Sequence, residues 1–181
     1  TDAWQQYTDN KYQLPKPIWG EIVDQITALE AVTGTRFGDS ERPLFVSARS
    51  GASVSMPGAM ETILNIGICD AALPALAKEI GPYAATASYI DLIARMGMQV
   101  YGIDLNKFIQ PETNQDINEQ LAQVKNIFRQ ETGRDFPQDP VFRIQDCGAT
   151  PGWEPVVIVG GPIIKQLDFN YTQGVMRDGF I

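Results

Sequence analysis

The sequence contains no histidine, the side chain whose ordinary pKa best suits proton transfer near neutral pH. This absence excludes a Ser-His or Cys-His nucleophile pair, a histidine metal ligand and a phosphohistidine within these 181 residues. Cysteine is also scarce, because Cys69 and Cys147 stand alone and far apart. Two unclustered cysteines fit neither a disulfide framework nor a zinc site, and they favour a reducing, cytosol-like compartment.

Long apolar runs and clustered basic residues are absent as well. No run approaches the ~20 apolar residues of a membrane span, and the N-terminal TDAWQQYTDNKYQLPK lacks the features of a signal peptide. We therefore expect a cytoplasmic protein with no membrane partner. The 14 basic residues are scattered among 22 acidic ones, giving a net charge of −8, so we expect no nucleic-acid partner. Any small anionic ligand must be held by local donors.

Apolar periodicity predicts an α+β, mainly helical chain with two or three short strands. Helices are predicted over residues 18–32, 60–67, 70–80, 84–96 and 117–131. Gly34 and the pair Gly81-Pro82 are expected to end two of them. Buried strands are predicted at residues 44–46 and in VVIVGG, whereas FGDSERP, GRDFPQDP and CGATPGWEP are predicted as turns or loops.

Residues 46–60, VSARSGASVSMPGAM, have almost no large side chain. A linker, a structural turn and an anion-binding loop all fit such a composition. The stretch follows an apolar strand and carries Arg49 at the strand's end, where a guanidinium can fork onto phosphate oxygens. Four serines add hydroxyl donors, but the stretch is neither a Walker loop nor a GxGxxG fingerprint. From these residues alone, a structural turn and a phosphate-binding loop remain equally open.

A longer segment carries a family resemblance. RFGDSERPLFVSARSGASVSMPGAMETILNIG is similar to the N-terminal nucleotide-binding region of the pyruvate, phosphate dikinase family, whose pattern is approximately FGD…PLLVSVRSGA..SMPGMMDTILNLGLND. SYIDLIARMGMQVYGID and QVKNIFRQETGRDFPQDP resemble later segments of that family, so the resemblance covers residues 12–146. The chain departs from the pattern at Ala59-Met60-Glu61, where the family has Met-Met-Asp, and at Cys69-Asp70, where it has Asn-Asp.

The resemblance implies a partial ATP-grasp lobe with a helical insertion. It places the lobe and its phosphate loop in residues 1–70, a helical insertion subdomain in 71–146 and a divergent tail of uncertain structure in 147–181. In the complete family enzyme, phosphate passes from ATP through a histidine of a swivelling domain to pyruvate, giving phosphoenolpyruvate. The family's phosphate-contacting arginine maps onto Arg49, and its glycine-rich turn maps onto residues 55–62. The ATP-binding residues implied by the resemblance are Arg49, Ser50, Gly51, Ser55, Gly58, Met60 and Thr62.

Several parts of the family's machinery have no match in these 181 residues: its glycine-lysine motif, its metal ligands and its phosphohistidine domain. We therefore assign no catalytic and no metal-binding residue, and ATP, with Mg²⁺ in the complete enzyme, is the expected cofactor. The resemblance predicts the ATP-binding part of a dikinase-like phosphotransferase that does not catalyse alone. The alternative is a stand-alone, non-catalytic interaction or regulatory protein derived from the dikinase fold. Expected partners are a nucleotide and either a second copy of the chain or the remainder of a dikinase.

Four other patterns have simpler interpretations. A strand followed by a turn accounts for VVIVGGPIIK better than a phosphate loop does. The spacing of Asp104, Glu112 and Asp116 fits no oxygen-ligand loop, so a solvated acidic face is favoured. Cys69 is expected to be a small core residue. The aromatic residues near the N-terminus form an expected packing cluster rather than a base-stacking platform; they are Trp4, Tyr7, Tyr12 and Trp19.

Overall fold

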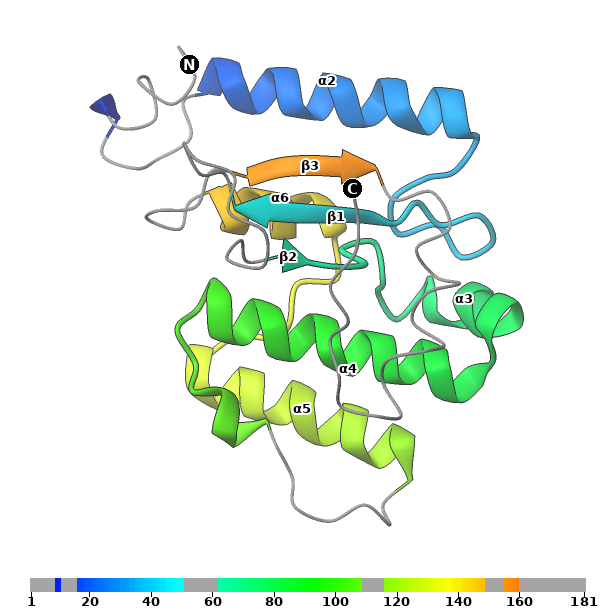
Figure 1. Cartoon of the computed structure of the whole chain (residues 1–181), viewed down its shortest axis with the longest axis vertical. Helices are drawn as coiled ribbons and strands as arrows, with labels where there is room; N and C mark the ends of the chain where they lie inside the picture. The colour runs from blue at the N-terminus through cyan, green and yellow to red at the C-terminus, as the bar shows by residue number, and fades with distance from the viewer. Residues whose placement is uncertain (1–8, 11–15, 51–61, 109–115, 149–154, 160–181) are drawn as a thin grey trace.

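A small sheet and several helices make up the computed structural model of the chain, which describes residues 9–10, 16–50, 62–108, 116–148 and 155–159. The sheet lies between α2 and the helices α3, α4 and α5 (Figure 1). The α+β, mainly helical class predicted from the sequence is confirmed. The elements in chain order are α2 (Lys16–Thr33), β1 (Val46–Ser50), β2 (Thr62–Ile63), α3 (Leu73–Ile80), α4 (Pro82–Gln99), the 3₁₀ turn η1 (Leu105–Lys107), α5 (Ile117–Thr132), α6 (Pro140–Gly148) and β3 (Pro155–Val159).

The three strands form a sheet of order β2-β1-β3, in which β1 is antiparallel to both neighbours. The β1–β3 ladder runs along all of β1, from Val46 opposite Val159 to Ser50 opposite Pro155. The β1–β2 ladder has only two register pairs. VVIVGG was correctly predicted to contain a strand, and this strand from the segment expected to diverge lies beside β1.

The four long amphipathic patterns predicted helices correctly, at α2, α3, α4 and α5. The apolar residues that recur at helical spacing in α4 and α5 are buried: Tyr89, Ile93, Met96 and Phe128 are each 0% exposed. Gly34 and Gly133 end α2 and α5 in left-handed conformations, with φ of 65° and 73°. Val32 continues the helical spacing of Ile26 and Leu29, which predicts a buried position, but this prediction is wrong because Val32 is 87% exposed in the last turn of α2.

One helix prediction was wrong, and one strand was predicted with the wrong bounds. The helix expected over residues 60–67 is absent from its described part, where Thr62 and Ile63 form β2 and Asn65 has φ of 58°. The strand expected at residues 44–46 begins only at Val46 and continues to Ser50. The three-residue spacing of Ile63 and Ile66 resembles a helical face, but the positive φ of Asn65 interrupts any helix there.

Helix α6 was missed because GRDFPQDP was predicted as a turn and CGATPGWEP as a loop. Pro140 is the first residue of α6, a position where its missing N–H costs nothing. Asp139 Oδ1 accepts a hydrogen bond from the Val141 N–H at 2.9 Å, as an N-terminal cap does. The helix then continues through Cys147 to Gly148, into the predicted loop.

One hydrophobic cluster joins α2, the sheet and the helices. It runs from Ile26 through Val46 and Ile63 to Tyr89 and Ile144. Trp19 packs against this cluster, whereas Trp4, Tyr7 and Tyr12 lie outside the described residues. Residues on both sides of the predicted boundary at 70/71 therefore share one core, and the division into a lobe and an insertion stays a prediction. No helix in the described ranges has the length and apolar character needed to cross a membrane.

Edge-to-face aromatic contacts hold together α4, α5 and the segments that follow them, which we call the helical layer. The ring centroids of Tyr101 and Phe128 are 4.9 Å apart, and those of Phe128 and Phe136 are 5.2 Å apart. Burial raises the pKa of the Tyr89 hydroxyl above its ordinary value. Burial and a hydrogen bond to Asp146 raise the pKa of the Tyr101 hydroxyl in the same way. Both phenols are therefore held in their neutral form.

Among the described glycines, Gly67 has the least room for a side chain. A Cβ on Gly67 would lie 1.8 Å from the Leu44 carbonyl oxygen, so Gly67→Ala must displace backbone rather than a flexible side chain. We expect a loss of about 2 kcal/mol or more in the free energy of unfolding, measured by urea denaturation. Gly20→Ala is the matched control, because Gly20 is an exposed helical residue with no atom within 4 Å of the added Cβ. Gly20→Ala should raise the free energy of unfolding by about 0.5–1 kcal/mol. Equal behaviour of the two variants would contradict the close approach.

The buried tyrosines predict a loss of stability at alkaline pH. Their folded-state pKa values lie above the unfolded value of about 10, so their stabilising contribution is complete below about pH 10 and falls as the pH rises further. Urea denaturation across this range should show the free energy of unfolding falling. Tyr101→Phe removes one ionisable hydroxyl and should flatten part of this slope. An unchanged slope in Tyr101→Phe would show that other charges cause the alkaline loss.

Candidate functional site

Arg49 lies next to the end of β1, the central strand of the sheet. Its backbone is opposite Thr62 of β2 on one side and Val156 of β3 on the other. Because β1 and β2 are antiparallel, the chain leaves the sheet after Ser50 and returns at Thr62 at the same end of the strands. The fold thus brings together the backbones of three predicted phosphate-binding residues, Arg49, Ser50 and Thr62; we call them the strand-end site. The other predicted members lie outside the described residues: Gly51, Ser55, Gly58 and Met60.

The strand-end site stands on a buried base. Immediately before Arg49, Ser47 is 4% exposed and Ala48 is fully buried, and Ile63 beside Thr62 is fully buried too. Ser47 and Ala48 are successive strand residues that point to opposite faces of the sheet, so β1 is covered on both faces. The core therefore determines where the backbone of Arg49 lies.

After β2 the chain makes a tight turn that returns to β1. The Ile66 N–H donates to the Val46 carbonyl at 2.9 Å, and the Ile68 N–H donates to the Asn65 carbonyl at 3.0 Å. Asn65 is 6% exposed and adopts the left-handed conformation that asparagine tolerates better than most residues. The turn is therefore packed into the core, with Ile66 and Ile68 fully buried.

Arg143 of α6 holds this turn from the other side. Its side chain is completely buried, and its Nη1 donates to the carbonyls of Ile66, at 2.6 Å, and Ile68. Its Nε donates to the Pro137 carbonyl at 2.7 Å, and its Nη2 reaches the Gln138 carbonyl at 3.5 Å. We call this set of contacts the Arg143 clamp. Burial lowers the pKa of the guanidinium. Arginine nonetheless keeps its positive charge in proteins.

Arg143 was not predicted from the sequence, although a signal was present. The contacted carbonyls lie 77 and 75 residues earlier in the chain, beyond the reach of any local pattern. However, Pro140, Arg143, Ile144 and Cys147 have the spacing of one buried helical face, and all four are buried. A basic residue on an otherwise apolar face indicates a buried partner set.

Gln138 joins the same region to the helical layer. Its Oε1 accepts from the Asp70 N–H at 3.0 Å, and its Nε2 hydrogen-bonds to the Tyr89 hydroxyl at 3.1 Å and the Phe136 carbonyl at 3.0 Å. Asp70 also pairs with Lys125 of α5. The three segments that carry the family resemblance therefore meet at Gln138 and the Arg143 clamp.

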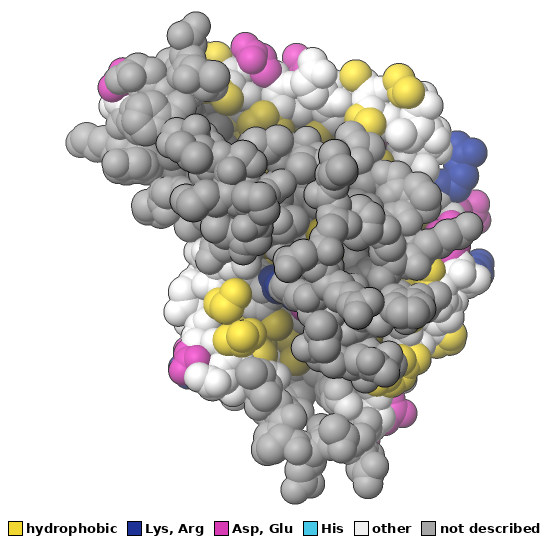
Figure 2. Space-filling view, in the orientation of Figure 1, with side chains coloured by type: hydrophobic (Ala, Val, Ile, Leu, Met, Phe, Trp, Pro, Cys, Tyr) yellow, Lys and Arg dark blue, Asp and Glu magenta, His cyan; other side chains and the backbone are white. Residues whose placement is uncertain are grey.

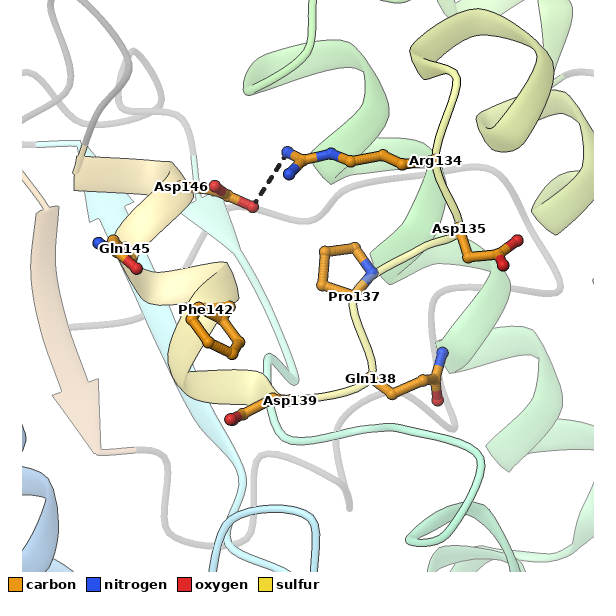
Figure 3. A pocket seen from close by; sticks show the side chains of 8 residues that line it. All are labelled: Arg134, Asp135, Pro137, Gln138, Asp139, Phe142, Gln145 and Asp146. Carbon is orange, nitrogen blue, oxygen red and sulfur yellow. Dashed lines mark hydrogen bonds and ion pairs between the residues drawn. The ribbon is translucent and has the colours of Figure 1, made fainter.

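A surface pocket of about 660 Å³ lies beside α6 (Figure 3). Three carboxylates and one guanidinium give its charged lining a negative balance, which is unsuited to phosphate. Its charged groups already have partners: Arg134 Nη2 lies 3.4 Å from Asp146 Oδ2, and Asp139 caps α6. We assign no anion site to it. The lining residues are Arg134, Asp135, Pro137, Gln138, Asp139, Phe142, Gln145 and Asp146.

Acidic residues elsewhere have structural partners. Asp104 accepts from the Asn106 N–H at 2.9 Å before η1, and Asp116 accepts from the Asn118 N–H at 2.7 Å before α5. Glu112 lies outside the described residues. Across the described ranges, no group of three or more acidic or cysteine side chains is arranged to hold a metal ion. Cys69 is 3% exposed, as expected of a core residue, and burial raises the pKa of Cys147 to about 12.

No family model matches the chain. The chain is 34% identical over 160 residues to the chloroplastic pyruvate, phosphate dikinase of Mesembryanthemum crystallinum, covering 80% of this chain and 17% of that protein. It is 36% identical over 160 residues to pyruvate, phosphate dikinase 1 of Zea mays, with the same coverage. Pyruvate, phosphate dikinase of Clostridium symbiosum is 34% identical over 157 residues, covering 77% of this chain and 18% of that protein.

These similarities extend over most of the chain and confirm the resemblance carried by its motifs. The chain nevertheless spans less than a fifth of the length of the curated relatives it matches, at 17–18%. Over the aligned stretch, the chain therefore belongs to the pyruvate, phosphate dikinase family as a partial region of the family's longer sequence.

Proposed function

We propose that this region binds the phosphates of ATP within a dikinase-like phosphotransferase, with Arg49 as the principal contact. Homology to the dikinases supports a phosphotransferase region. The observation that carries the finer proposal is the place of Arg49, beside the end of the central strand and opposite Thr62. The glycine-serine segment 51–61 joins these two positions in the sequence.

The residue types suit a phosphate. A guanidinium offers a fixed fork of donors that matches two phosphate oxygens. Ser50 and Ser55 add hydroxyl donors, and Gly51 and Gly58 allow backbone N–H groups to approach an anion without a side chain between them. Met60 and Thr62 complete the proposed set. In a chain of net charge −8, such local donors have to supply the attraction.

We extend the proposal to the architecture that the resemblance implies. Residues 1–70 form a partial ATP-grasp lobe, residues 71–146 a helical insertion, and residues 147–181 a tail that contributes β3 to the sheet. In the whole protein, phosphate would pass from ATP towards pyruvate. Phosphoryl transfer depends on positioning and on neutralisation of charge by metal ions and cations. The sequence holds no match to the family's glycine-lysine motif or metal ligands, so we propose that this region binds ATP without transferring its phosphate alone.

A partner for the region is part of the same proposal, either a second copy of the chain or the remainder of a dikinase. Hydrophobic side chains reach the surface over α2 and over the helical layer (Figure 2). An apolar surface of this kind favours association. Within the part of the chain that the structure describes, the exposed large hydrophobic residues are Val23, Val32, Tyr83, Leu105 and Phe142. We also propose that the protein is cytoplasmic, as its two unclustered cysteines favour.

Replacement of Arg49 tests the phosphate role. Isothermal titration with MgATP should show at least about tenfold weaker binding in Arg49→Ala, because a charge-assisted hydrogen bond to an anion is lost. Arg49→Lys keeps the charge but loses the fork, so its affinity should lie between those of Arg49→Ala and the native protein. Arg129→Ala is the matched control, since Arg129 is a largely exposed arginine of α5 that pairs with Asp135. It should bind like the native protein.

Circular dichroism of each variant establishes that it is folded before its affinity is compared. Equal affinity in Arg49→Ala and the native protein would refute the phosphate role. It would favour the alternative, in which the chain is a non-catalytic interaction protein and the glycine-serine stretch is a structural turn. Failure of the native protein to bind MgATP would refute binding by the isolated region. Formation of ADP or AMP by the native chain would refute the proposed lack of catalysis.

A further inference from the structure

We infer that Arg143 is a positioning residue for the proposed ATP-phosphate site, acting through the turn between β2 and α3. The inference rests on the proposed function of Arg49. It assigns to Arg143 a role that extends beyond the stability of the core, namely to fix the backbone of Thr62 relative to that of Arg49. Three observations carry it.

The first observation is the shortness of β2. This strand has two residues, and its ladder with β1 consists of the pairs Ala48–Ile63 and Arg49–Thr62. Two register pairs are too few to define a stable ladder by themselves. The position of Thr62 opposite Arg49 therefore depends on what holds the chain immediately after Ile63.

The second observation is that the chain after Ile63 is held at two points. On the sheet side, the Ile66 N–H donates to the Val46 carbonyl at 2.9 Å. On the opposite side, one nitrogen of Arg143 donates to the carbonyls of both Ile66 and Ile68. The N–H and the C=O of Ile66 are thus fixed by different elements, which leaves the turn little freedom to slide along β1.

The third observation is that Arg143 is itself rigidly placed. Its guanidinium lies 4.6 Å from the centroid of the Phe136 ring and donates to the Pro137 carbonyl. The other end of α6 is tied to the helical layer, because Asp146 accepts from the Tyr101 hydroxyl and pairs with Arg134. The clamp therefore transmits the position of α6 and the helical layer to the turn.

These contacts form a short path to the proposed site. Ile66 lies four positions after Thr62, and its partner Val46 lies three positions before Arg49 on β1. A shift of the turn would move Thr62 along or away from β1, and a misplacement of about 1 Å at a binding group lowers its effectiveness strongly. Loss of the clamp is therefore expected to weaken phosphate binding even in molecules that remain folded.

The test compares MgATP affinity and folding stability in matched variants. Arg143→Met removes all four donated hydrogen bonds, whereas Arg143→Lys keeps the charge and part of the donor capacity. Arg95→Met makes the same chemical change on an arginine whose ion pair with Asp91 lies within α4, outside the contacts of the clamp. Val124→Ala lowers stability from the helical layer, since Val124 is a buried residue of α5, 3% exposed.

Arg143→Met should bind MgATP about tenfold more weakly than the native protein, and Arg143→Lys should recover part of the loss. Arg95→Met and Val124→Ala should keep native affinity, although Val124→Ala is less stable. Native affinity in folded Arg143→Met would overturn the inference. So would a loss of affinity in Val124→Ala that matches its loss of stability, because the effect would then be general. If Arg49→Ala binds like the native protein, the proposed function fails instead, which separates the two failures.

A measurement on the native protein decides the matter if neither Arg143 variant folds. By the reciprocity of linked equilibria, a turn that positions the phosphate site should itself be stabilised when the site is filled. Hydrogen exchange followed by NMR should slow at the amides of Thr62, Ile63, Ile66 and Ile68 when MgATP is saturating. The amides in the middle of α5, around Val124, provide the internal comparison. Unchanged exchange from Thr62 to Ile68 on nucleotide binding would overturn the inference.

Discussion

The guanidinium of Arg143, buried among backbone carbonyls, is the interaction on which the arrangement of the other elements depends. Burying a charge is unfavourable unless its donors are satisfied. Here the acceptors in the described part of the chain are carbonyl oxygens, which meet the donors without a carboxylate. Arginine suits this position because its guanidinium is weakly hydrated and its donors have fixed directions. The turn after β2, the segment before α6 and α6 itself must therefore all be in place together.

The turn is constrained from the sheet side as strictly as from the side of Arg143. Gly67 packs so closely on the Leu44 carbonyl that no side chain fits between them. Asn65 takes the left-handed conformation, which reverses the chain so that Ile66 can reach Val46. Each of these features would be unfavourable alone. Together they place two buried isoleucines in the core and turn their carbonyls towards Arg143.

The distance between interacting residues explains what the sequence could predict. The helices α4 and α5 were predicted because their buried residues recur at helical spacing within one segment. In contrast, β2 and α6 are determined by contacts between residues 75 and 77 positions apart, which a local pattern does not contain. The position of Arg49 beside a strand end was predictable, since a strand and a glycine-rich stretch are both local features. The register of Arg49 opposite Thr62 was not predictable, because the two-residue strand β2 has the apolar spacing of a helix.

The tail has a closer relation to Arg49 than its divergent sequence suggested. β3 pairs with all five residues of β1, whereas β2 pairs with two. The strand that carries Arg49 is therefore supported mainly by residues 155–159, which lie beyond the segment 12–146 that carries the family motifs. Without β3, one side of β1 would present unpaired backbone groups along its length. The family motifs supply the residues of the proposed site, but the strand that holds Arg49 in the sheet is completed by the tail.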